Sequence, residues 1–70
     1  MAKKLSDFEQ GIFYSAGLMV EFDQPVFAAD ILAAAGLLES NVSELDETEQ
    51  LAMKKLMLDT SRAKFTGFTV

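Results

Sequence analysis

Apolar residues recur every three or four positions through the first third of the chain, which is the spacing of one helix face. Ser6, with Glu9 three residues later, forms a capping-box signal, so we expect a helix from Asp7 to about Phe22. Six residues share its apolar face: Phe8, Ile12, Phe13, Ala16, Met19 and Val20. Leu18 and Phe22 widen this face beyond half of the circumference, which predicts a helix at the centre of the fold.

Two glycines interrupt this helix, and each costs about 1 kcal/mol relative to alanine in a helix interior. Gly11 and Gly17 either permit a neighbouring helix to approach closely or indicate a shorter helix. The simplest interpretation is that the helix tolerates them.

A second helix is predicted from Pro25 to about Ala35, because proline favours the first turn of a helix. Asp23 or Gln24 would cap its beginning, and Gly36 stands where a left-handed residue ends a helix. Asp30 is the one charge in an otherwise apolar helix, so it either faces solvent or pairs with a cation of a partner.

The third helix follows an acidic connection at residues 39–47, and two residues compete to cap it. Ser43 has Asp46 three positions later, and Asp46 has Glu49, so both spacings fit a cap. We expect the helix to extend to about Ser61 or Lys64.

The third helix carries two apolar faces. One face is formed by Ala52, Met53, Leu56 and Met57, and a single core explains it. Leu51 and Leu58 form the other face, which needs either the C-terminal tail or a second subunit to cover it. The tail at residues 65–70 is β-prone, and core packing is favoured over a role as a peptide strand that offers Phe68 and Val70 to another domain.

These elements predict an all-α fold: a small compact bundle of three helices with a short β-prone C-terminal tail, forming one domain over residues 1–70. The second apolar face of the third helix predicts self-association through Leu51 and Leu58, as a homodimer or a higher oligomer.

The amino-acid composition of this 70-residue chain excludes most kinds of catalytic site. It has no cysteine and no histidine, which excludes disulfides, thiolate and imidazole metal ligands, and Ser-His-Asp or Cys-His catalysis. The acidic run from Glu44 to Glu49 lacks the glycine of a calcium loop, and no phosphate-binding glycine motif is present. We therefore expect no enzymatic activity, no cofactor and no metal.

Charge is distributed unevenly, with a net value of −5. No lysine or arginine occurs from Leu5 to Gln50, a stretch that holds ten acidic residues. Such a field repels phosphates and attracts basic surfaces, so direct nucleic-acid binding is not expected. No apolar run approaches the roughly 20 residues that span a bilayer, and no signal peptide is evident, so we expect a cytoplasmic protein without membrane contact.

Acids beside aromatic residues favour recognition of a basic protein surface. The predicted partner-binding residues are Tyr14, Glu21, Asp23, Asp30, Glu44, Asp46, Glu47 and Glu49. The function expected from them is a non-enzymatic inhibitor or modulator of a basic nucleic-acid-handling or host-defence complex. It would present carboxylates where phosphates bind, as small acidic phage and mobile-element proteins do. Two alternatives are a homo-oligomeric structural or assembly protein and a binder of a small cationic or neutral ligand.

Overall fold

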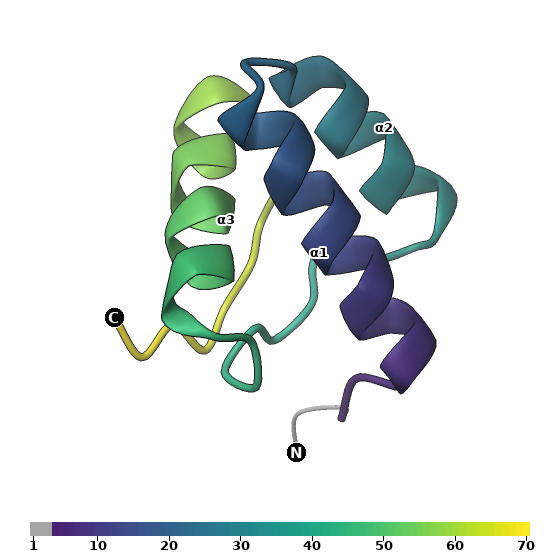
Figure 1. Ribbon diagram of the computed structural model, residues 1–70, viewed down its shortest axis with the longest axis vertical. Helices are drawn as coiled ribbons and strands as arrows, with labels where there is room; N and C mark the ends of the chain where they lie inside the picture. The colour runs from purple at the N-terminus through teal and green to yellow at the C-terminus, as the bar shows by residue number, and fades with distance from the viewer. Residues whose placement is uncertain (1–3) are drawn as a thin grey trace.

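Three helices make up the fold in the computed structural model, which describes residues 4–70: α1 (Asp7–Glu21), α2 (Pro25–Ala34) and α3 (Glu47–Asp59). Figure 1 shows α1 crossing between α2 and α3, with the C-terminal segment returning alongside α3. Within residues 4–70 the only β-type pairing outside helices is one isolated parallel bridge. The predicted all-α bundle of three helices is confirmed.

The predicted capping box begins α1. The Glu9 N–H donates to Ser6 Oγ at 3.1 Å, and the Ser6 N–H donates to Glu9 Oε1 at 2.9 Å. The turn into α2 places Asp23 in the left-handed region, with φ of 61°. Gln24, rather than Asp23, is the residue before α2, and its side chain makes no capping hydrogen bond.

Gly36 ends α2 as predicted, with φ of 72°. The Leu37 N–H donates to Leu32 O at 2.8 Å and the Gly36 N–H to Ala33 O at 3.0 Å, which satisfies carbonyls at the helix end.

Asp46, rather than Ser43, caps α3, because the hydroxyl of Ser43 donates instead to Asn41 Oδ1 at 2.6 Å. The prediction that α3 extends to Ser61 or Lys64 is wrong. Thr60 is already extended, and the chain turns there so that Ala63 and Phe65 can return to the core.

The core lies where the three helices meet the returning tail. Its buried apolar residues are Leu5, Phe13, Ala16, Val20, Ala28, Ala29, Leu32, Leu37, Val42, Leu45, Ala52, Met53, Leu56, Ala63 and Phe65. The Phe13 and Phe65 rings meet edge to face, with centroids 5.8 Å apart. The predicted packing of the tail into the core is therefore confirmed at Phe65.

Gln50 is the buried polar residue that ties the tail to α3. Its Nε2 donates to Leu45 O at 2.9 Å, and its Oε1 accepts from the Thr69 N–H at 2.8 Å. The tail also pairs with residues 40–42, since the Val42 N–H donates to Thr66 O at 2.8 Å. Beside this pairing Gly67 has φ of 79°, and a Cβ there would lie 2.5 Å from the amide of Asn41.

The apolar face of α1 and the second apolar face of α3 are less buried than the sequence predicted. Phe8 was placed on the inward face of the first helix, but it is 77% exposed. The buried side of α1 is set by Phe13, Ala16, Gly17 and Val20, and helical spacing turns Phe8 away from it. The tail does not cover the second face of α3, since Leu51 remains 50% exposed and Leu58 88% exposed. The tail instead follows the Gln50 and Lys54 side of that helix.

Candidate partner-binding surface

Four of the predicted partner-binding residues lie around one hollow between α1 and α3. Tyr14 and Glu21 come from α1, Asp46 is the cap of α3, and Glu49 is in its first turn. The hollow has a volume of about 70 Å³, and Leu18 and Ala52 are among its apolar lining residues. Residues that are up to 35 positions apart in the sequence thus form one acidic site with an apolar floor.

A second, wider hollow of about 310 Å³ shares Glu21, Thr48 and Ala52 with the first and adds Leu51 and Lys55. We call the two together the α1–α3 groove. It combines carboxylates, one phenol and exposed apolar surface along a continuous path. Lys55 is the one basic side chain among the residues that line it.

Gly17 and Asp46 explain the shape of the groove. Gly17 is buried in the middle of α1, and a Cβ built on it would lie 3.7 Å from the Ala52 Cβ, so two small residues let the helices approach closely. Since α1 runs through both glycines, the interpretation that the helix tolerates them is confirmed. Asp46 Oδ1 accepts from the Glu49 N–H at 2.8 Å, which fixes both residues at the mouth of the groove.

The environment of the groove disfavours the charged form of Glu49. Partial burial raises the pKa of the Glu49 carboxyl, and the nearby charge of Asp46 and a hydrogen bond to it raise that pKa further. A cation placed between these carboxylates would relieve the repulsion that the fold imposes.

The other predicted acids lie outside the groove. Asp23 occupies the turn between α1 and α2, and Glu44 and Glu47 are exposed before and at the beginning of α3. Asp30 needs no cation from a partner, because Arg62 of the same chain lies 2.8 Å from its carboxylate, with both side chains about half exposed. The expectation that Asp30 faces solvent is therefore confirmed, and its cation comes from the same chain.

Leu51 and Leu58, predicted to mediate self-association, are both exposed on α3, about two turns apart. Leu51 lines the α1–α3 groove, whereas Leu58 stands near the other end of α3 and contributes to none of the hollows described here. Self-association through this pair stays a prediction.

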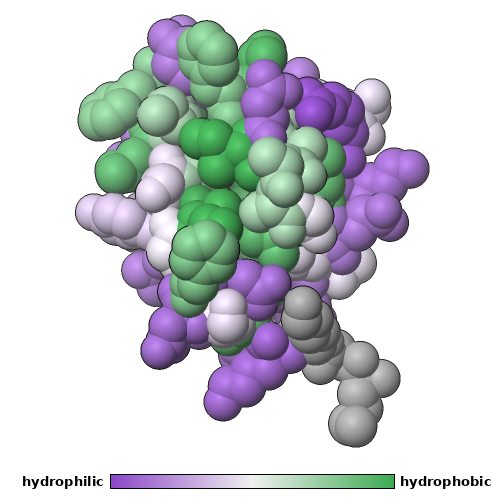
Figure 2. All heavy atoms as spheres, turned by 90° about the vertical axis from the view of Figure 1, so that its right-hand side faces the viewer, coloured by the Kyte–Doolittle hydropathy of each residue, from purple (hydrophilic) through white to green (hydrophobic). Residues whose placement is uncertain are grey.

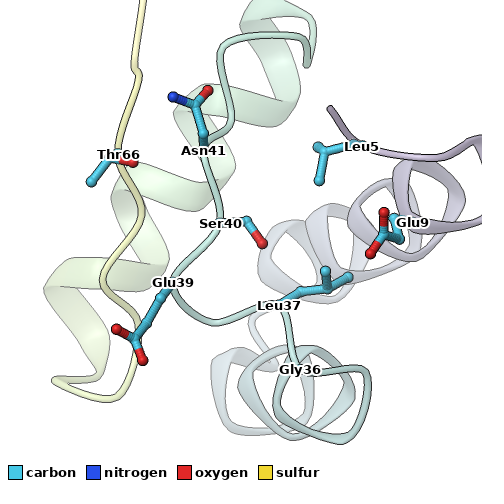
Figure 3. A pocket seen from close by; sticks show the side chains of 8 residues that line it. All are labelled: Leu5, Glu9, Gly36, Leu37, Glu39, Ser40, Asn41 and Thr66. Atoms are coloured by element: carbon cyan, nitrogen blue, oxygen red, sulfur yellow. The ribbon is translucent and has the colours of Figure 1, made fainter. Parts of the chain in front are cut away.

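A third hollow, of about 360 Å³, lies where the loop after α2 meets the beginning of α1 and the tail. No pattern in the sequence predicted it. Figure 3 shows Leu5, Glu9, Leu37 and Ser40 around one space, whereas Glu39 points away from it. Glu9 is already bonded to the Ser6 N–H within the capping box. Glu9 therefore serves the helix end, and we assign this hollow no ligand.

Residues 4–70 include no group of three or more acidic side chains arranged to hold a metal ion. In the same part of the chain, no helix has the length and apolar character needed to cross a bilayer. The chain matches no family model, and comparisons with curated proteins and with solved structures give no match. The chemistry of the α1–α3 groove is accordingly the basis for a functional proposal.

Proposed function

We propose that this protein is a non-enzymatic binding module whose α1–α3 groove recognises a basic protein surface. The partner class that fits best is a cytoplasmic protein that handles nucleic acid, because such proteins expose clustered lysine and arginine. By occupying that surface, an acidic chain of net charge −5 would act as an inhibitor or modulator.

The observation that carries the proposal is the convergence of Tyr14, Glu21, Asp46 and Glu49 on one hollow with apolar walls. A lysine or arginine side chain has a long aliphatic stem and a cationic head. The stem would lie along Leu18 and Ala52, and the head would reach the carboxylates. Tyr14 adds an aromatic ring, which favours a nearby cation.

The raised pKa of Glu49 supports the same assignment, because the groove holds negative charge at a cost before any partner arrives. Binding a cation would remove that cost, so the interaction should be strongly dependent on ionic strength.

The test is a pull-down from host lysate at low and high salt with two charge-reversed variants. Glu21→Lys with Glu49→Lys changes the groove, and Glu39→Lys with Glu44→Lys changes the net charge equally outside it. We expect the wild type and the control to retain the same basic protein at low salt, and the groove variant to lose it. The retained protein should also bind its nucleic acid less tightly when the wild type is added.

Equal capture by both variants would show that only overall charge matters, and the groove would not be the site. Capture that is unchanged in high salt would contradict electrostatic recognition and favour the alternative function, a homo-oligomeric assembly protein, because hydrophobic association does not weaken with salt.

A further inference from the structure

The side of the molecule opposite α3 carries an apolar face. Phe8 and Ile12 of α1 and Phe27 and Ile31 of α2 form what we call the α1–α2 face. Figure 2 views the molecule from the α2 side and shows a continuous apolar area bordered by polar residues. Phe8 is 77% exposed and Phe27 is 58% exposed, so this face is uncovered in the single chain.

A groove runs through this face beside Gly11. It has a volume of about 340 Å³ and is lined by Asp7, Phe8, Gly11, Ile12, Ser15 and Ile31. A Cβ built on Gly11 would meet no atom within 4 Å, so the notch is open to an incoming side chain. A protruding phenylalanine and an open notch therefore lie next to each other on one surface.

The charged residues near the α1–α2 face indicate which kind of molecule can bind there. Asp7 is the one charged residue that lines the groove, and Asp30, elsewhere on α2, is paired with Arg62. Two copies of a chain with net charge −5 repel each other across their acidic surfaces. A second copy that approaches the α1–α2 face does not bring the acidic α1–α3 grooves of the two chains against each other.

The size of the face fits a weak dimer. An aromatic side chain offers about 150–250 Å² of contact area, so the exposed parts of the two phenylalanines alone contribute on the order of 200–350 Å². With the two isoleucines the total enters the range of roughly 300–600 Å² at which apolar patches often mark interaction sites. Specific interfaces at the small end bury about 600 Å² per partner, including a polar rim.

We propose that the α1–α2 face binds a second copy of this chain in a two-fold symmetric dimer. Symmetry makes the same patch serve both partners, so Phe8 of each copy enters the notch at Gly11 of the other. This inference is independent of the acidic groove, which lies on the α3 side of α1 and stays open in the dimer. A dimer would thereby present two grooves to a basic partner.

The deciding experiment compares Gly11→Arg with Gly11→Ala. Both replace a helical glycine in open space, so both should fold at least as well as the wild type. Only arginine fills the notch and places a cation there. Sedimentation equilibrium from about 10 µM to about 1 mM covers the range in which so small an interface should dissociate.

We expect a concentration-dependent dimer for the wild type and Gly11→Ala, and at least about tenfold weaker dimerisation for Gly11→Arg. Phe8→Gln should weaken the dimer similarly, and Leu58→Lys, on α3, should leave it intact. A monomer at every concentration would overturn the proposal and leave the face to a different protein. A dimer that survives Gly11→Arg but is lost in Leu58→Lys would place self-association on α3 instead.

Discussion

The two sides of α1 use the same residue type to opposite effect. On the α3 side, Gly17 is buried against Ala52, and the close helix contact forms the floor of an acidic groove. On the outer side, Gly11 faces open space and notches an apolar surface. The two glycines are six positions apart in one helix.

The two glycines have different roles because different elements lie next to them. Where α3 presents alanine, the space beside the glycine is narrow and admits at most a methyl group. Where no element covers the helix, the missing side chain leaves a site that another molecule can fill. The charges follow the same division, since the cap and first turn of α3 supply Asp46 and Glu49 to the first side only.

Replacing the buried Gly17 with a larger residue should change stability more than any other substitution proposed here. Gly17→Leu would force a branched side chain between α1 and α3, which should cost about 1–3 kcal/mol of unfolding free energy. Gly17→Ala is the control, because its Cβ would stand at an ordinary 3.7 Å from Ala52. Thermal denaturation measures both, and equal stability of Gly17→Leu and the wild type would contradict the close contact.

Removing the cap of α3 should have the next largest effect. Asp46→Ala deletes the acceptor for the Glu49 N–H and should cost about 1 kcal/mol. Asp46→Asn keeps an acceptor but loses the charge, so it should retain stability while weakening partner binding. Urea denaturation distinguishes the two variants. If Asn proved as destabilising as Ala, the charge and not the hydrogen bond would hold the helix end.

Filling the exposed glycine should act in the opposite direction. Gly11→Ala should raise the unfolding free energy by up to about 1 kcal/mol, because it removes backbone entropy from the unfolded chain and meets no atom in the fold. Urea denaturation at a fixed protein concentration gives the value. A loss of stability would show that this part of α1 is covered in solution.

The smallest effect concerns the carboxyl of Glu49. Because the fold raises its pKa, the folded state holds that proton more tightly than the unfolded chain. Stability from this group is therefore present at acid pH and is lost as the pH rises through the ordinary pKa of glutamate and up to the raised one. Glu49→Gln should be slightly more stable than the wild type at pH 7, with the difference vanishing near pH 4, about the ordinary glutamate pKa. Denaturation curves at both pH values test this, and a difference that grows towards acid would contradict the assigned direction.

Local signals predicted the beginnings of α1 and α2 and the end of α2. The pair Ser6 and Glu9, Pro25, and the glycine at position 36 each act on backbone groups within a few residues, so the sequence alone locates them. The end of α3 was not predictable in this way. It depends on the burial of Phe65 against Phe13, a contact between residues far apart in the chain.

The sequence predicted the kinds of residue that form the candidate site, but not which of the predicted residues belong to it. Acids and an aromatic residue indicated a binding surface, but only packing decides that Glu49 faces Tyr14 while Glu44 and Glu47 do not. Helical periodicity likewise grouped Phe8 with the core residues of α1. It could not show that packing against α2 and α3 buries the side of α1 that carries Phe13 and Gly17 and leaves Phe8 outside.

The edge-to-face pair of Phe13 and Phe65 has a consequence for synthesis. A ribosome completes all three helices before it reaches the residue that closes the core over Phe13. The nascent chain must therefore keep apolar surface around Phe13 open until Phe65 has emerged. Contacts between residues so far apart in the sequence slow folding, so we expect the closure of Phe65 over Phe13 to come after the helices form.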